Sequence, residues 1–205
     1  MTTPILFYFD FTSPHTYLAL DNIRRVAERH GRAIDWRAMS VFQLWDAIDY
    51  HPIGKPRAKA RYIRRDFERA AAVAGLPFQM PKPFPVDAVL ARQLFYSVKA
   101  DAPDLAADLA AALFTRYWAE GEDITTAEQI AAAAAPLGIA VDAIRAAGDD
   151  PAAADAVAAA SAQAVEDGAF GAPYFIVDGE PFWGHDRVAH IDWRLSQAGA
   201  DSSGG

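Results

Sequence analysis

The stretch ILFYFDFTSPHTYLAL, residues 5–20, decides the fold class of this chain. Its first five residues are aliphatic or aromatic, which is typical of a strand that is buried on both faces. Ser13 and Pro14 then suit the N-cap and the first position of a helix, and Gly31 suits the end of that helix. Residues 34–39 predict a second strand. The chain therefore opens as a β-α-β unit, with parallel strands and a right-handed crossover.

The pattern changes after this unit, because residues 41–168 predict helices only. Helices are expected to start at Pro56, at the capping-box sequence beginning with Thr125 and at Asp150-Pro151, and to span 86–98 and 105–118. Gly168 is a suitable C-cap for the last of them. The sequence therefore predicts a large helical insertion.

Strand signals return beyond the insertion. Residues 174–177 and 180–183 flank Asp178-Gly179, which is a tight-hairpin sequence. A final amphipathic helix is expected up to about residue 198. These segments predict one α/β domain in two pieces, 1–40 and 169–199. The helical domain 41–168 is inserted between the pieces, and a mobile tail at 200–205 follows.

Composition excludes several classes of protein. Of the 205 residues 52% are hydrophobic, so a disordered chain is excluded. The longest apolar run, 130–140, is far shorter than the ~20 residues that a membrane-spanning helix needs. A net charge of −8 argues against general nucleic-acid binding. No cysteine is present, which excludes disulfides, thiolate metal ligands and a cysteine nucleophile, and no metal site is expected. The first residues lack a secretory signal, so we expect a cytoplasmic protein.

Five segments, taken in order, resemble one known family over about residues 4–197. The 2-hydroxychromene-2-carboxylate isomerases carry similar segments, and they belong with the kappa-class glutathione transferases in the DsbA-like branch of the thioredoxin fold. The resemblance implies a thioredoxin-like domain with a large helical insertion. The matching segments are FYFDFTSPHTYL at 7–18, KARY at 59–62 with Asp66 and Arg69, WAEGEDI at 118–124, GAPYF at 171–175 and FWGHDR at 182–187.

Ser13 is the central candidate residue. Thiol oxidoreductases of this branch have Cys-Pro-His-Cys where this chain has residues 13–16, SPHT. Disulfide exchange is therefore excluded, because it requires a thiolate of the protein itself. The resemblance implies that Ser13 instead donates a hydrogen bond to the thiolate of bound glutathione, at a helix N-terminus that favours anions. The alternative is a plain N-cap. A serine-hydrolase role is disfavoured because Gly-x-Ser-x-Gly is absent.

Two later segments supply the remaining expected glutathione contacts. By resemblance, Pro173 is cis, and the backbone of Ala172 pairs with the cysteinyl unit of glutathione. His185 and Asp186 would hold its γ-glutamyl end, with Asp186 facing the ammonium group. The alternatives are an ordinary turn proline and, for Asp186, another N-cap.

Lys59 is the second catalytic candidate, because a lysine there can meet a carboxylate of glutathione or substrate. Most of the basic segment 55–69 is expected to be a solvated face. Pro14, His15, His51 and Tyr62 are secondary candidates for the substrate pocket. The family's asparagine in Asn-x-Pro-Pro is missing from DYHPIG, residues 49–54, where His51 or Tyr50 is a possible substitute.

The expected function is therefore a glutathione-dependent isomerase acting on a small anionic aromatic substrate, as a homodimer without nucleic-acid or membrane partners. Two alternatives remain open. A kappa-like transferase would consume glutathione, whereas isomerisation would not. A thioredoxin-like binding module without catalysis would fail to bind a thiol.

Overall fold

The computed structural model describes residues 2–50 and 57–202. Strand β1 (Ile5–Phe9), helix α1 (Pro14–Arg29) and strand β2 (Ile34–Ala38) form the predicted β-α-β unit. β1 and β2 are parallel, with Ile5 opposite Ile34, as the opening sequence indicates. α1 stops where Gly31 takes a positive φ of 59°, which a side chain would disfavour.

The predicted hairpin completes the sheet. β3 (Tyr174–Val177) and β4 (Glu180–Trp183) are antiparallel, and the strand order is β2-β1-β3-β4. Asp178 and Gly179 have φ values of 51° and 84°, the left-handed conformations that a two-residue type I′ turn requires. This mixed four-stranded sheet confirms the thioredoxin-like fold class.

Every described element between β2 and β3 is helical. α2 and α7 were not singled out from the sequence, and Thr126 rather than Thr125 caps α6 by accepting from the amide of Gln129. The elements are α2 (Val41–Ala47), α3 (Arg57–Ala74), α4 (Val89–Asp101), α5 (Pro103–Phe114), η1 (Thr115–Ala119, a π-helical turn), α6 (Ala127–Ala134), η2 (Ala135–Leu137), α7 (Val141–Asp149) and α8 (Pro151–Glu166).

The chain ends with the short 3₁₀ turn η3 (His185–Arg187) and helix α9 (Val188–Ser202). α9 thus continues into the segment 200–205 that was expected to be a tail. Residues 203–205 of that segment lie outside the described residues.

The side chains of β1 alternate between two hydrophobic cores, one on each face of the sheet. Helices cover both of these faces. Ile5, Phe7 and Phe9 are fully buried in the larger core, which the helical insertion shares. Tyr8 faces the smaller core with Ala172 and neighbouring residues. Each buried aromatic or aliphatic side chain contributes about 1.5–3 kcal/mol, so both faces stabilise the sheet.

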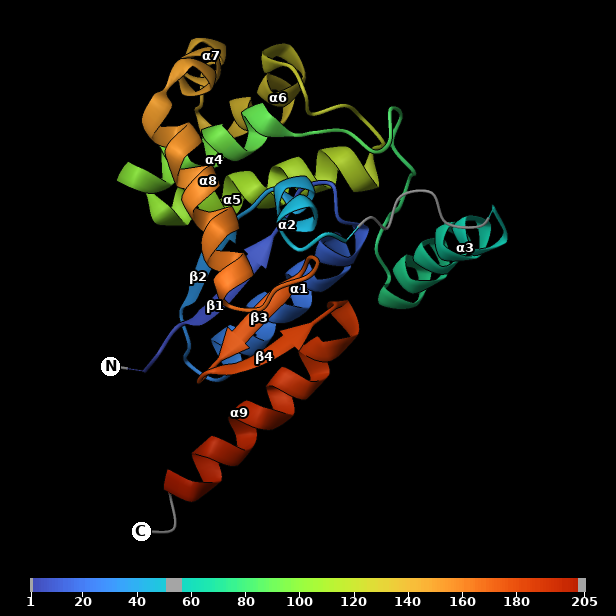
Figure 1. Cartoon of the computed structure of the whole chain (residues 1–205), viewed down its shortest axis with the longest axis vertical. Helices are drawn as coiled ribbons and strands as arrows, with labels where there is room; N and C mark the ends of the chain where they lie inside the picture. Colours follow the sequence, from blue (N-terminus) through green and yellow to red (C-terminus); the bar gives the residue numbers. More distant parts are fainter. Residues whose placement is uncertain (1, 51–56, 203–205) are drawn as a thin grey trace.

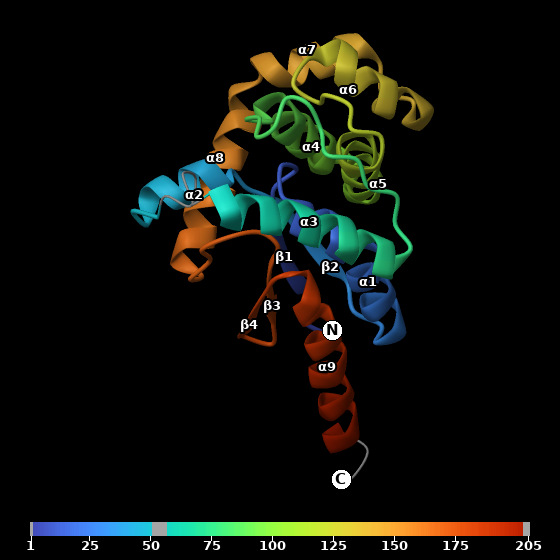
Figure 2. The same ribbon diagram turned by 90° about the vertical axis from the view of Figure 1, so that its right-hand side faces the viewer.

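The helices α4 to α7 gather at one end of the molecule, α9 extends to the other end, and the sheet lies between them (Figure 1). α8 extends from the helical group back to the sheet, whereas α3 lies beside α1 (Figure 2). The start of α1, the segment before β3 and the turn after β4 are thereby brought to one region. None of the described helices is both long and apolar enough to cross a membrane.

Candidate active site

Ser13 lies at the N-terminus of α1 and contacts the segment before β3. Its Oγ accepts a hydrogen bond from the amide of Thr16 at 3.3 Å, so it is the N-cap of α1. The same hydroxyl donates to the carbonyl oxygen of Ala172 at 2.7 Å. The Ala172-Pro173 peptide bond is cis. The structure therefore brings together Ser13 and Ala172-Pro173, which are distant in sequence, and Ser13 has a second contact beyond its capping bond.

A buried ion pair supports the turn that carries Ser13. Asp10 is fully buried, and its Oδ1 accepts from both the amide and the hydroxyl of Thr12. Its Oδ2 accepts from the amide of Val41 at 2.8 Å and from Arg92 of α4 at 3.2 Å. The amide of Ser13 donates to the carbonyl oxygen of Asp10. Sequence reasoning missed this support, although an aspartate after a fully apolar strand is a signal of a buried, partnered charge.

Trp118 supports the same turn from η1. Its indole Nε1–H donates to the carbonyl oxygen of Phe11 at 2.9 Å, and the whole side chain is buried. Trp118, the first residue of the segment 118–124, therefore joins the helical insertion to the turn. This contact gives the motif a structural role in positioning Ser13.

η3 places His185 and Asp186 beside the same region. The amide of Gly184 donates to the carbonyl oxygen of Pro173 at 3.1 Å, which joins η3 to the cis-proline segment. Nδ1 of His185 lies 3.0 Å from Nδ1 of His15 on α1. Asp186 is exposed and accepts from Arg187 at 2.7 Å. Ser13, Pro173 and His185 thus belong to one connected set of contacts.

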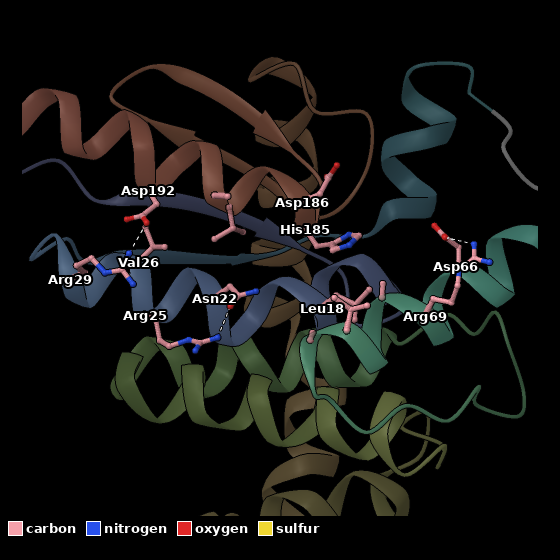
Figure 3. Close-up of a pocket in the computed structure, with 15 residues that line it drawn as sticks. Leu18, Asn22, Arg25, Val26, Arg29, Asp66, Arg69, His185, Asp186 and Asp192 are labelled. Atoms are coloured by element: carbon pink, nitrogen blue, oxygen red, sulfur yellow. Dashed lines mark hydrogen bonds and ion pairs between the residues drawn. The ribbon is translucent and has the colours of Figure 1, made fainter.

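A groove of about 790 Å³ lies between α1, α3, η3 and α9. Figure 3 shows His185 and Asp186 in its middle, the Asp66–Arg69 pair on one side and the Arg29–Asp192 pair at the far end. Leu18, Val26, Ala70 and Val188 supply apolar lining. The groove therefore offers both acidic and basic groups over an apolar surface, which suits a dipolar ligand.

Burial changes the chemistry of His185. Removal from water lowers the pKa of its imidazole, while the carboxylates of Asp186 and Asp66 act in the opposite direction. The neutral ring is consequently favoured near pH 7. Among residues 2–50 and 57–202, no three histidine or acidic side chains gather closely enough to hold a metal ion.

The remaining candidates are placed differently. Lys59 is exposed on the first turns of α3 and does not line the described groove. Tyr62 is 61% exposed and packs against the guanidinium of Arg69 at 5.2 Å. Pro14 is buried in the first turn of α1, and His51 lies outside the described residues. Tyr50, the other possible substitute for the asparagine, is 45% exposed and packs against Trp45.

Known proteins resemble this chain over nearly its whole length. The model of the DSBA-like thioredoxin domain matches residues 4–196. A 2-hydroxychromene-2-carboxylate isomerase from Sphingobium xenophagum is 30% identical over 194 residues, covering 94% of this chain and 97% of the relative. A Caenorhabditis elegans protein named glutathione S-transferase kappa 2 is 24% identical, covering 91% and 89% of the two chains.

Structural comparison agrees with the sequence comparison. A solved 2-hydroxychromene-2-carboxylate isomerase superposes with a TM-score of 0.87 at 24% identity, covering 98% of each chain. At that identity the superposition supports the fold, and the family membership follows from the sequence matches. The chain therefore belongs to the DSBA-like thioredoxin family and, within it, to the 2-hydroxychromene-2-carboxylate isomerases.

Proposed function

We propose that this protein is a glutathione-dependent cis-trans isomerase of the 2-hydroxychromene-2-carboxylate type, acting in the degradation of aromatic compounds. The observation that carries the proposal is the contact of Ser13 with Ala172, beside a cis proline, in a chain without cysteine. Because the protein has no thiol of its own, the thiol at this site would come from a bound ligand such as glutathione. The names of the similar isomerases and of the kappa-class relative support this assignment.

The residues present fit glutathione. The hydroxyl of Ser13 is a hydrogen-bond donor at a helix N-terminus, where an anionic sulfur is favoured. The backbone at Ala172 offers an edge for an extended peptide. The exposed carboxylate of Asp186 suits the ammonium of the γ-glutamyl group, and the groove beside it holds arginines for carboxylates.

Bound glutathione would supply a nucleophilic sulfur, whose addition to a conjugated double bond permits rotation and whose elimination restores that bond. Ser13 would lower the pKa of the thiol by donating to the sulfur in place of its present acceptor, the carbonyl of Ala172. Lys59 would neutralise negative charge that develops on the pyruvate side of the substrate. Glutathione is regenerated in this sequence.

Calorimetric titration and product analysis test the proposal together. We expect glutathione to bind and 2-hydroxychromene-2-carboxylate to be isomerised with no net loss of glutathione. If one glutathione is consumed for each product molecule formed, the protein is instead a kappa-like transferase. The similarity to the kappa-class relative is consistent with this alternative. Absence of binding at millimolar glutathione would contradict the proposal and would indicate either that another thiol is used or that the protein is a non-catalytic binding module.

Replacing Lys59 by methionine should lower kcat about 10- to 100-fold with little change in the free energy of unfolding. The expected loss is that of one electrostatic contact in the transition state, and an exposed side chain contributes little to stability. Lys59→Arg should restore part of the rate. Arg64→Met, which removes another exposed cation of α3, is the matched control and should leave kcat unchanged. Equal rates for Lys59→Met and Arg64→Met would remove Lys59 from the mechanism.

A further inference from the structure

His15 and His185 form a side-chain pair that the proposed chemistry does not use. The Nδ1 atoms are 3.0 Å apart, and the two rings are nearly parallel, with centroids 5.1 Å apart and planes at 20°. A hydrogen bond between two imidazole nitrogens needs one N–H and one lone pair. The two facing nitrogens therefore hold a single proton between them.

The pair connects two parts of the site. His15 is the second residue of α1, two positions after Ser13, whereas His185 begins η3 and immediately precedes Asp186. On its other side the ring of His15 meets Phe67 of α3 edge to face, at 4.9 Å. Both histidines are only partly exposed. This contact thus links η3 to the start of α1.

Charged groups surround the pair on several elements. α3 contributes Asp66 and Arg69, which bind each other, and η3 contributes Asp186 and Arg187, which also bind each other. On α9, Asp192 lines the same groove but is bound to Arg29 and His30 of the α1 end. The ring of His185 points along the groove towards the Asp66–Arg69 pair (Figure 3). The nearby carboxylates already have cationic partners, so they compensate a second imidazole charge only in part.

We propose that His15 and His185 are positioning residues that share one proton, hold η3 with Asp186 against the Ser13 end of α1, and separate when a second proton binds. The pair itself is independent of the ligand. Its consequence for glutathione affinity rests on the proposed function.

The sign of the pH effect follows from the burial of His185. Its pKa is lower in the folded protein than the ordinary value of about 6.5, so the unfolded chain binds this proton more readily. The associated stability is present above about pH 6.5 and is lost as the pH falls towards the folded-state pKa. Separation of η3 from α1 is expected over the same range.

Nitrogen-15 NMR of the histidine side chains in the ligand-free protein tests the pair directly. We expect the resonances of His15 and His185 to titrate together, with the second proton binding below pH 6.5 and with simultaneous shifts of the Gly184 and Asp186 amides. In His15→Phe, which keeps a ring against Phe67, His185 should titrate alone. Independent titration of the two residues in the native protein would overturn the proposal.

Glutathione binding supplies the second readout. His15→Phe should weaken binding about threefold to tenfold at pH 7.5, as expected for one hydrogen bond, and should flatten the pH dependence of affinity between about pH 5 and 7. His190→Gln is the matched control, because His190 is an exposed residue of α9 that neighbours Arg187 of η3 and lies outside the pair. It should leave both the affinity and its pH dependence unchanged. If His15 and His185 titrate together but the protein binds no glutathione, the proton-sharing pair is supported and the glutathione site is rejected. An unchanged pH profile in His15→Phe would reject the positioning role.

Discussion

Replacing Arg92 by methionine is expected to lower the free energy of unfolding by about 3–5 kcal/mol, the range for breaking a buried ion pair by removing one partner. Only 2% of the Arg92 side chain is exposed, and the carboxylate of Asp10 is fully buried. Without the guanidinium, Asp10 keeps its bonds from Thr12 and Val41 but loses its cationic partner. An uncompensated charge then remains inside the core.

Urea unfolding of matched variants measures this effect. Arg145→Met removes an exposed arginine with two acidic partners, Glu128 and Asp142, and should cost less than about 1 kcal/mol. A loss below 1 kcal/mol for Arg92→Met alone would contradict this role of the ion pair.

The Asp10–Arg92 ion pair illustrates which parts of the structure the sequence could predict and which it could not. The apolar strand, the Ser-Pro helix start and the Asp-Gly turn are local signals, and the structure has the expected element at each. Asp10 and Arg92 are 82 positions apart, and His15 and His185 are 170 apart. No local periodicity relates such residues. Their meeting depends on how the helical insertion and η3 pack onto the β-α-β unit.

The placement of Ser13 near Ala172 was predictable for a different reason. Ser13-Pro14-His15-Thr16 and Ala172-Pro173 each match a segment of one family, so their proximity follows from the family's fold. Lys59 shows the limit of such transfer. Its helical position was inferred correctly, but α3 leaves Lys59 exposed and outside the described groove, because few residues of this helix pack against the core. Whether Lys59 reaches the substrate is decided by kinetics.

Replacing Ser13 by alanine is expected to reduce the isomerase rate about 10²- to 10³-fold, the cost of losing one preorganised donor to developing or bound negative charge. Glutathione should still bind, because the backbone at Ala172 and the groove remain. The pKa of the bound thiol should rise by about 1–2 units, since hydrogen bonds to charged groups contribute about 1.5–3 kcal/mol. Ultraviolet absorbance of the thiolate as a function of pH measures that shift.

Ser13 also caps α1, so its replacement costs about 1 kcal/mol of stability independently of any catalytic role. Ser40 separates the two effects. It caps α2 with nearly the same backbone angles, φ −90° and ψ 111° against −93° and 112° for Ser13, and its Oγ accepts from the amide of Gln43. Ser40→Ala should therefore lose a similar capping contribution while keeping the rate and the thiol pKa, and Ser13→Ala should lose somewhat more stability because its hydroxyl also donates to the carbonyl oxygen of Ala172. If Ser13→Ala binds glutathione and behaves like Ser40→Ala, Ser13 is a helix cap only, and the thiolate must be stabilised by the helix N-terminus without it.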